Sequence, residues 1–272
     1  MSLNRIILFT LVAGFSVFQS CSKVKLSATA TESERMEAAI KLFEKGDYVE
    51  AKTQFRILTL SHSGSLIADK AQFYLAECHF NMKEYILAAS EYERLIKVYP
   101  NSEYTDDAKF KLGLSYYRLS PHYGLDQEYT RQAIMHLQEF LEDYPASDLK
   151  AQVEQYLLEA RNKLAQKVFS SAEIYRKMKY YESALIYYDK LMEEFYDTPY
   201  AAYALFWTAD CHRVMKRYDQ ALEMFDLFIQ KNPQHEWLGR ARAKITQTRR
   251  DYERQLRHDA RSNKPTDEGI GE

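Results

Sequence analysis

The chain has 272 residues, of which 46% are hydrophobic and 28% are charged, with only eight glycines and six prolines. This is enough chain to bury a continuous core, and the abundance of Ala, Leu, Glu, Lys and Tyr favours helices over a sheet. The formal net charge of −2 argues against a general nucleic-acid-binding protein, which would be markedly basic. Length, composition and charge therefore predict a helical protein with no nucleic-acid partner.

The N-terminal segment 1–20 has the pattern of a secretory signal. Arg5 precedes a short apolar run, and a serine and Cys21 follow it. A charged start, a short apolar core and a small residue at the cleavage site are typical of such signals, and the run is too short to span a bilayer comfortably. A cysteine after the small residue resembles a bacterial lipobox, although Phe18 and Gln19 depart from the usual residues. We predict a lipoprotein signal peptide with lipid attachment at Cys21; a cysteine that stands there by chance is the alternative.

Segment 21–33 follows the signal and is rich in Ser, Thr and Ala, without periodicity. This composition predicts an acylated flexible tether. Ser22 stands where an aspartate would resemble an inner-membrane retention signal, which favours the outer membrane. Lys23 and Lys25 stand where some bacteria mark surface-exposed lipoproteins with acidic residues. We therefore expect a lipid-anchored protein on the periplasmic face of the cell outer membrane.

The stretch 68–100 has the pattern of two short helices in a hairpin. The second helix carries apolar residues at the i, i+3, i+4, i+7 spacing of an amphipathic helix, and Pro100 ends it. Ala76 stands on the first helix, and Ala88 and Tyr92 stand on the second. Small residues where helices touch, with large ones between them, match the 34-residue tetratricopeptide pattern.

This hairpin returns four more times. An alanine in the second helix recurs as Ala51, Ala88, Ala133, Ala184 and Ala221. Twelve residues earlier a small residue recurs as Ala39, Ala76, Ala172 and Ala209, and in the third copy as Gly113, which an insertion at 120–127 moves upstream. An irregular bundle would not keep this phase. We predict an all-α tetratricopeptide-repeat α-solenoid of five helical hairpins, with repeats 1–3 in 34–147.

The segment 148–261 is predicted to hold a long spine helix, repeats 4–5 and a C-terminal capping helix. No helix breaker occurs between Asp148 and Arg176, so one helix of about 28 residues spans ~42 Å, with Ser147 or Asp148 as its cap. The capping helix should begin near Gln234. Its nine Lys and Arg between Arg240 and Lys264 are either a solvated face or a docking surface for an acidic partner. The polar tail 262–272 is predicted to be disordered.

Residues for chemistry are hard to find. Cys78-His79 and Cys211-His212 occupy the same positions of two repeats, and no second Cys or His follows at i+3 or i+4 to complete a metal-ligand set. The sequence also has no Ser/His/Asp arrangement and no glycine-rich phosphate loop. We therefore expect no metal, no cofactor and no enzymatic activity.

A binding surface is easier to argue from the first helices of the hairpins. Aromatic residues recur there three residues before the small position and four after it: Phe43, Phe73, Phe80, Phe110 and Tyr117. In repeats 4 and 5 the later position holds Arg176 and Arg213. One interpretation is an aromatic groove for an extended or hairpin peptide, with a cationic C-terminal half. The other is core packing between helices, and the sequence leaves both open.

The chain from 34 to 233 also resembles the BamD (ComL-like) family of outer-membrane protein assembly lipoproteins. The residues that carry this resemblance are Tyr99-Pro100-Asn101-Ser102, Asp126-Gln127 with Thr130, Tyr144-Pro145-x-Ser147, Arg161-x-x-Leu164-Ala165 and Tyr180-Tyr181-x-x-Ala184. The chain departs from the family at Leu125, where an arginine is usual, and at Tyr196, where repeat 4 should show its proline.

The resemblance implies a non-catalytic scaffold of the β-barrel assembly machinery. The C-terminal repeats, with Arg176 and Arg213, would dock on the BamA-type barrel subunit. The N-terminal groove would receive the aromatic C-terminal signal of unfolded outer-membrane proteins. The alternative is another periplasmic tetratricopeptide adaptor lipoprotein for cell-envelope or division coordination. The division coordinator of the Tol–Pal system, for example, has fewer repeats behind a coiled coil and lacks the acylated cysteine.

Overall fold

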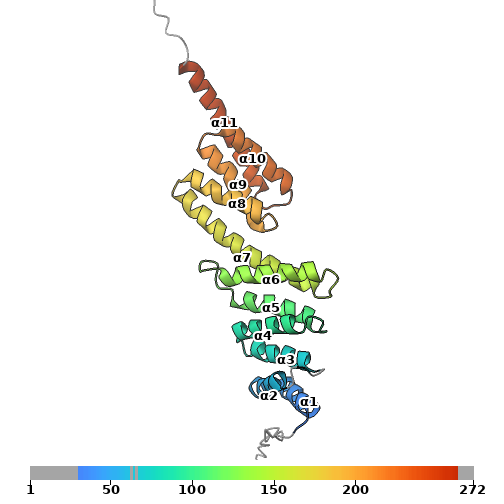
Figure 1. Cartoon of the computed structure of the whole chain (residues 1–272). Helices are drawn as coiled ribbons and strands as arrows, with labels where there is room; N and C mark the ends of the chain where they lie inside the picture. Colours follow the sequence, from blue (N-terminus) through green and yellow to red (C-terminus); the bar gives the residue numbers. More distant parts are fainter. Residues whose placement is uncertain (1–29, 62–63, 65–66, 263–272) are drawn as a thin grey trace, which may run out of the picture.

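The computed structural model describes residues 30–61, 64 and 67–262. These residues form eleven α-helices and no strand (Figure 1). In chain order the helices are α1 (Glu32–Glu44), α2 (Tyr48–Ser61), α3 (Ala68–Asn81), α4 (Tyr85–Val98), α5 (Thr105–Leu119), α6 (Glu128–Asp143), α7 (Lys150–Lys177), α8 (Tyr181–Glu194), α9 (Pro199–Val214), α10 (Tyr218–Lys231) and α11 (Leu238–Ser262). The predicted signal peptide, Cys21, most of the tether and nearly all of the tail lie outside the described residues.

Successive helices pair into five antiparallel hairpins that stack along one direction, from α1 at one end to α10 at the other (Figure 1). Helix α11 packs on α10 and α9 and closes the stack. The predicted all-α solenoid of five hairpins with a C-terminal capping helix is therefore confirmed. Among the described residues, no helix has both the length and the apolar composition needed to cross a membrane.

The small residues of the first helices are buried at the contact between the two helices of each hairpin. Ala39, Ala76, Ala172 and Ala209 are fully buried. In the third hairpin the helices approach more closely, because a Cβ atom on Gly113 would lie 2.9 Å from Cδ2 of Leu137. Only a residue without a side chain fits this contact unchanged. This approach explains why repeat 3 carries glycine where the others carry alanine.

Helix α7 is the predicted spine of 28 residues, and it joins two stacks. Its first half packs with α5 and α6 around Phe140 and Val153, and its second half packs with α8 and α9 around Tyr188. The predicted cap is wrong, because the N-cap residue is Leu149, which has no side-chain cap. The Ser147 hydroxyl instead accepts a hydrogen bond from the Leu149 amide at 3.2 Å.

The capping helix begins at Leu238, four residues later than predicted. A turn separates it from α10, since Asn232 O accepts from His235 N at 3.1 Å and His235 O accepts from Leu238 N at 3.1 Å. The amide and the carbonyl of His235 are bonded within this turn, so they are not available to a helix that starts earlier. It also brings Trp237 against the core of the last hairpin.

Four of the five hairpins share one turn geometry between their two helices. The second residue after the end of the first helix has a positive φ angle: 79° at Gly46, 62° at Lys83, 66° at Lys179 and 63° at Lys216. The left-handed conformation reverses the chain within three or four residues and satisfies the last carbonyls of the helix. Only the third hairpin differs, because the insertion occupies its turn.

Candidate peptide-binding groove

The first helices of neighbouring hairpins lie side by side and share one face. Polar contacts on this face join residues 34 positions apart on neighbouring helices. Lys111 of α5 pairs with Glu77 of α3 at 2.9 Å, and Lys244 of α11 pairs with Asp210 of α9 at 2.9 Å. The first helices therefore share one continuous surface, on which the predicted groove residues can lie.

The structure brings Phe43 and Phe73 into one row of aromatic rings, although they belong to different hairpins. Both side chains are half-buried. Tyr74 joins them, with ring centroids 5.2 Å from Phe43 and 5.8 Å from Phe73. The row continues to Tyr104, which stacks on Phe73 at 4.9 Å. Neither Tyr74 nor Tyr104 was among the predicted site residues, because Tyr74 lies next to the periodic position and Tyr104 lies outside the helix, directly before α5.

Phe80 and Tyr117 form a second, more polar part of the same face. Lys111 Nζ lies 4.8 Å from the Phe80 ring centroid, which is a cation–π geometry. The Tyr117 ring packs 5.0 Å from Tyr156 of α7, and its hydroxyl donates to Glu159. Burial, together with the bond to Glu159, raises the pKa of Tyr117 to about 12. Both rings are half-buried, so each keeps an accessible part.

Phe110 does not line an open groove. Its side chain is only 3% exposed, and its ring lies 6.3 Å from Phe140 and 6.1 Å from Tyr156. Phe110 occupies the core because the first half of the spine helix covers this part of α5. The core interpretation is therefore correct for this residue, whereas Phe43, Phe73, Phe80 and Tyr117 retain an accessible part.

The two predicted docking arginines are held by acids of their own helices. Arg176 makes a two-pronged ion pair with Glu173, with both N–O distances 2.6 Å. Its guanidinium lies 3.8 Å from the Trp207 ring centroid. Hydrogen bonding to Glu173 holds the pKa of Arg176 above its usual value. Arg213 donates to Asp210 at 2.8 Å. Neither cation is free, so their role in docking stays a prediction.

A third arginine on this face was not singled out from the sequence. The guanidinium of Arg240 lies 4.9 Å from the Trp207 ring and 4.7 Å from the Trp237 ring. Arg240 is exposed, and the structure gives it ring contacts but no ion pair with another described residue. The Trp207 ring therefore contacts two guanidinium groups, one paired with an acid and one accessible. The signal in the sequence was weak because Arg240 is one of nine basic residues in that segment.

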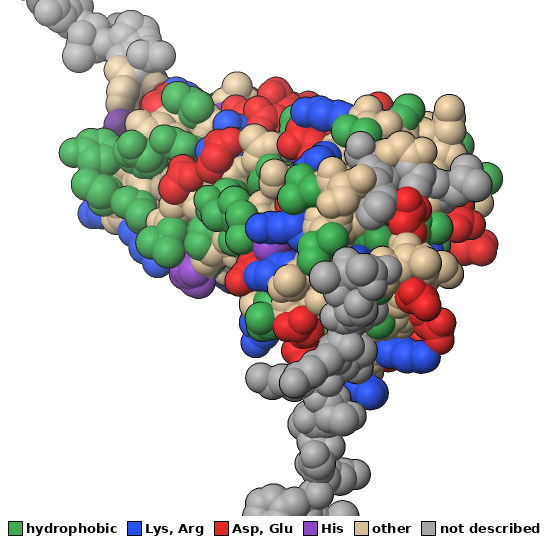
Figure 2. Space-filling model, turned by 60° about the horizontal axis from the view of Figure 1, so that its bottom comes forward, with side chains coloured by type: hydrophobic (Ala, Val, Ile, Leu, Met, Phe, Trp, Pro, Cys, Tyr) green, Lys and Arg blue, Asp and Glu red, His purple; other side chains and the backbone are tan. Residues whose placement is uncertain are grey.

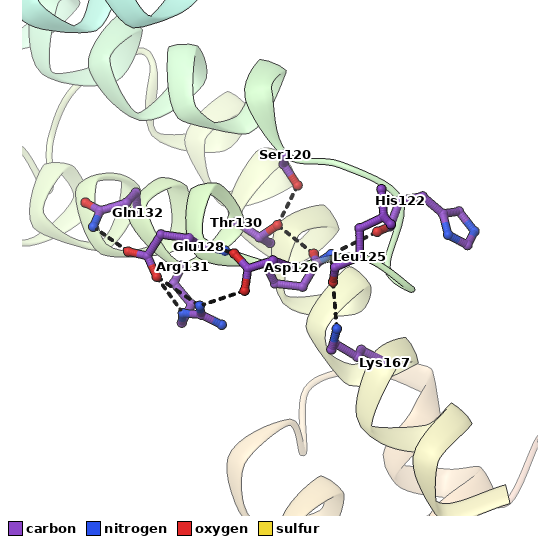
Figure 3. Close-up of polar contacts among 10 residues, drawn as sticks. Ser120, His122, Leu125, Asp126, Glu128, Thr130, Arg131, Gln132 and Lys167 are labelled. Carbon is purple, nitrogen blue, oxygen red and sulfur yellow. Dashed lines mark hydrogen bonds and ion pairs between the residues drawn. The ribbon is translucent and has the colours of Figure 1, made fainter. Parts of the chain in front are cut away.

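The inserted loop 120–127 folds back on itself and does not project as a free arm (Figure 3). The buried Gln127 side chain donates to the His122 carbonyl at 2.9 Å and the Leu125 carbonyl at 3.1 Å. Its oxygen accepts from Thr130 at 2.7 Å, and Asp126 accepts from the Glu128 amide at 2.9 Å. The Asp-Gln-x-x-Thr residues thus close the loop, and Asp126 satisfies the first amide of α6.

Two lysines of the spine helix fasten this loop. Lys163 donates to the Ser120 hydroxyl at 2.7 Å. Lys167 donates to the Leu125 carbonyl at 2.6 Å (Figure 3). Burial lowers the pKa of Lys163. The Leu125 side chain is 61% exposed. The loop therefore depends on the backbone of residue 125, and its side chain is left for solvent or a partner.

A hollow of about 450 Å³ lies between the loop, the spine helix and α9, with Tyr117, Tyr123 and Tyr200 in its wall. Asn162 lines this hollow and also a second one of about 720 Å³ between α7, α9 and α10. The side-chain oxygen of Asn162 is buried and has no hydrogen-bond partner among the described residues. The aromatic face of repeats 1–3 therefore ends in a cleft at the junction of the two stacks.

The described cysteines are structural. Burial raises the pKa of both Cys78 and Cys211 to about 12, with an adjacent carboxylate adding to the effect. At neutral pH these thiols are protonated and are poor nucleophiles or metal ligands. No cluster of three His, Cys, Asp or Glu side chains suited to a metal occurs in the described part of the chain.

The fold and this face define a tetratricopeptide-repeat protein with an aromatic face on its first helices. The sequence model of a family described as "Outer membrane lipoprotein" (YfiO) matches residues 29–221. Because this match covers well over half of the chain, the protein belongs to that family.

Two curated proteins are similar in sequence. The outer membrane protein assembly factor BamD of Helicobacter pylori is 29% identical over 147 residues, which are 53% of this chain and 65% of that protein. A putative BamD of Aquifex aeolicus is 28% identical over 192 residues, 70% of this chain and 63% of that protein. The chain thus spans just under two thirds of the length of each relative.

Solved tetratricopeptide-repeat structures are also similar to the chain. A tetratricopeptide repeat protein from Parabacteroides merdae has a TM-score of 0.35 at 15% identity, with 86% of this chain and 80% of that one covered. A putative kinesin light chain with nearly identical tetratricopeptide-like repeats, from Podospora anserina, has a TM-score of 0.40 at 12% identity, with 74% of this chain and 93% of that one covered.

Proposed function

We propose that the chain is a non-catalytic scaffold in outer-membrane protein assembly. It would be held on the periplasmic face of the cell outer membrane by lipid on Cys21. Membership of the outer membrane lipoprotein family and similarity to proteins named outer membrane protein assembly factor BamD support this role. A stack of hairpins with long side faces suits a protein that brings others together.

The substrate surface would be the row of half-buried rings on α1, on α3 and at the start of α5. The observation that carries this proposal is the line Phe43–Tyr74–Phe73–Tyr104, with rings in contact across two hairpins. Half-buried aromatic rings on a rigid stack offer large contact areas at low entropic cost. An extended segment of an unfolded outer-membrane protein would place its own aromatic side chains on this line.

The C-terminal stack would dock on a BamA-type barrel subunit. Arg176 and Arg213 would act there through their positions beside Trp207 and Asp210. Since both already pair with acids on the chain, an acidic partner must compete with these contacts, and such charges mainly affect encounter and register. The accessible guanidinium of Arg240 above Trp207 adds an unneutralised cation to this surface.

The groove is tested by measuring thermal midpoint and peptide affinity together. We expect Phe73→Ala and Phe80→Ala to weaken binding of a peptide ending in an aromatic residue by about ten-fold, or about 1.4 kcal/mol. The loss of stability should be well below the cost of a core truncation. Phe110→Ala is the matched control, since deletion of a buried phenylalanine ring costs about 3–5 kcal/mol.

A peptide in which the terminal aromatic residue is replaced by alanine should bind all variants equally weakly. The groove assignment would be wrong if Phe73→Ala and Phe80→Ala lost as much stability as Phe110→Ala and lost affinity only in proportion. It would also be wrong if both bound the aromatic peptide as well as the parent protein does.

A further inference from the structure

One edge of the second stack carries apolar side chains that project into solvent. Ile174 is 56% exposed, and Met178 and Tyr180, which flank the turn from α7 to α8, are each 58% exposed. On the next turn, Val214 is 41% exposed. Figure 2 shows this area as a green patch at the left edge of the molecule, with basic side chains beneath it. We call the two turns, residues 174–180 and 214–217, the turn edge.

The exposure has a structural cause. Two positions after the small residue, repeats 2 and 5 have Cys78 and Cys211, which are buried, whereas repeat 4 has Ile174. Six positions after it, Met82 and Met215 are half-buried, but Met178 is exposed. Helix α6 packs against the first half of the spine helix, so no preceding hairpin covers the start of the second stack. The positions that are buried or half-buried in repeats 2 and 5 are therefore exposed to solvent in repeat 4.

Cations accompany these apolar side chains. Lys177, Lys179 and Lys216 are exposed, and no ion pair in the described part of the chain involves them. The nearby acids already have partners, because Glu182 pairs with Arg217 and Asp219 accepts from the Tyr252 hydroxyl. The turn edge is thus cationic as well as apolar.

The backbone adds an independent observation. Lys179 and Lys216 have φ angles of 66° and 63°, a conformation that favours glycine, and repeat 1 has Gly46 at this position. The same conformation occurs at Lys83 in repeat 2, so it belongs to the hairpin turn, and it places Lys179 and Lys216 at equivalent positions of two successive turns. Beside Lys216, helix α11 lines a hollow of about 600 Å³ with Arg254 and His258 and also with Asp251 and Asp259. Arg254 pairs with Asp251 at 3.4 Å, so the cationic character belongs to the turn lysines and does not extend along the capping helix.

We propose that the turn edge is a membrane contact that rests on the headgroups of a bilayer containing anionic phospholipid. Apolar and tyrosine side chains that protrude between lysines suit the interface between headgroups and acyl chains. The lysines would be attracted by the negative surface potential. Such a contact would orient the solenoid relative to the bilayer independently of the lipid anchor and of the peptide groove.

The test uses the full chain with Cys21→Ser, which has no acyl chain, and vesicles of phosphatidylcholine with or without phosphatidylglycerol. We expect it to sediment with the anionic vesicles, and less so in high salt. Lys177→Gln, Lys179→Gln and Lys216→Gln together should weaken this binding roughly a hundred-fold, since each lysine near a membrane surface contributes roughly five-fold. Met178→Ser with Tyr180→Ser should weaken it while leaving the salt dependence unchanged.

The matched control removes the same charge elsewhere. Lys41, Lys97 and Lys190 are exposed lysines in ion pairs one helical turn apart, and their triple change to Gln should leave vesicle binding nearly intact. The proposal fails if the parent chain does not prefer the anionic vesicles, or if both triple variants weaken binding equally. It fails too if the turn-edge variant only abolishes a dimer seen in sedimentation, which would make this surface a contact between two copies of the chain.

Discussion

At the residue scale, an acidic side chain recurs at the same position of three repeats. Glu77, Glu173 and Asp210 each follow the small residue of a first helix, and the first two share an equivalent tyrosine partner. Glu77 accepts from the Tyr92 hydroxyl, and Glu173 accepts from the Tyr188 hydroxyl at 2.5 Å. In repeat 5 the tyrosine position is occupied by phenylalanine, which has no hydroxyl. Asp210 is bound instead by Arg213 and Lys244.

Asp210→Asn tests this charged arrangement. Burial alone would raise the pKa of Asp210, but hydrogen bonds from Lys244 and Arg213 outweigh it, and the pKa lies below its usual value. A carboxylate with a depressed pKa contributes stability above its unfolded pKa of about 3.9 and loses this as pH falls through its folded value. We therefore expect the variant to lose about 1–3 kcal/mol at pH 7.

Urea unfolding of parent and variant at several pH values measures this effect. The difference in unfolding free energy should be constant between about pH 6 and 8 and should shrink below about pH 4, where the parent protein also loses the charge. A difference that persisted unchanged into strong acid would mean that the charge of Asp210 does not stabilise the fold.

At the element scale, the turns between paired helices depend on backbone conformation more than on side-chain contacts. Repeat 1 has glycine at the left-handed residue of its turn, whereas Lys83, Lys179 and Lys216 take the same conformation in repeats 2, 4 and 5. Because left-handed backbone places the Cβ atom of an L-residue too close to a carbonyl oxygen, these three turns carry a small strain that repeat 1 lacks.

Lys83→Gly should therefore stabilise the protein by about 1 kcal/mol, although a more flexible unfolded chain offsets part of this gain. Lys190→Gly is the control, since Lys190 lies inside α8 and a helical glycine there should cost about 1 kcal/mol. Chemical denaturation measures both changes. Loss of stability in both variants would show that Lys83 makes contacts that outweigh the strain.

At the scale of the whole molecule, the spine helix and the inserted loop set the relation between the two stacks. The spine helix belongs to both cores, and Lys163 and Lys167 bind the loop of the first stack to it. Arg161 on the same helix pairs with Asp197, which precedes α9, at 2.6 Å. The two stacks are thus held by one continuous helix and by side chains on either side of its middle.

Ala160→Pro should disturb this junction. Ala160 is fully buried near the middle of α7, and a proline there removes a hydrogen bond and clashes with the preceding turn, at a cost of about 3 kcal/mol or more. Limited proteolysis should then cut within 150–177. Ala151→Pro is the control, because Ala151 is exposed in the first turn of α7, where proline is tolerated. Equal resistance of Ala160→Pro and the parent would contradict a rigid spine.

The sequence by itself determined the all-α class, the five hairpins, the 28-residue spine and the place of the insertion. It could do so because buried small and large residues recur with a fixed period, and periodicity is a local property of the chain. Gly113 belongs to this set, because the periodicity alone predicts a small residue there. Its contact with Leu137 is not needed for that prediction.

Only the tertiary structure decided which periodic aromatic residues are accessible. Phe80 and Phe110 have related sequence signals, but Phe110 is covered by the spine helix and Phe80 is half-buried. Likewise, Met178 has the same phase as Met82 and Met215, and it is exposed because the second stack begins beside it. Accessibility and ion pairing depend on which neighbouring helix packs over a position, and that neighbour is set by the whole fold.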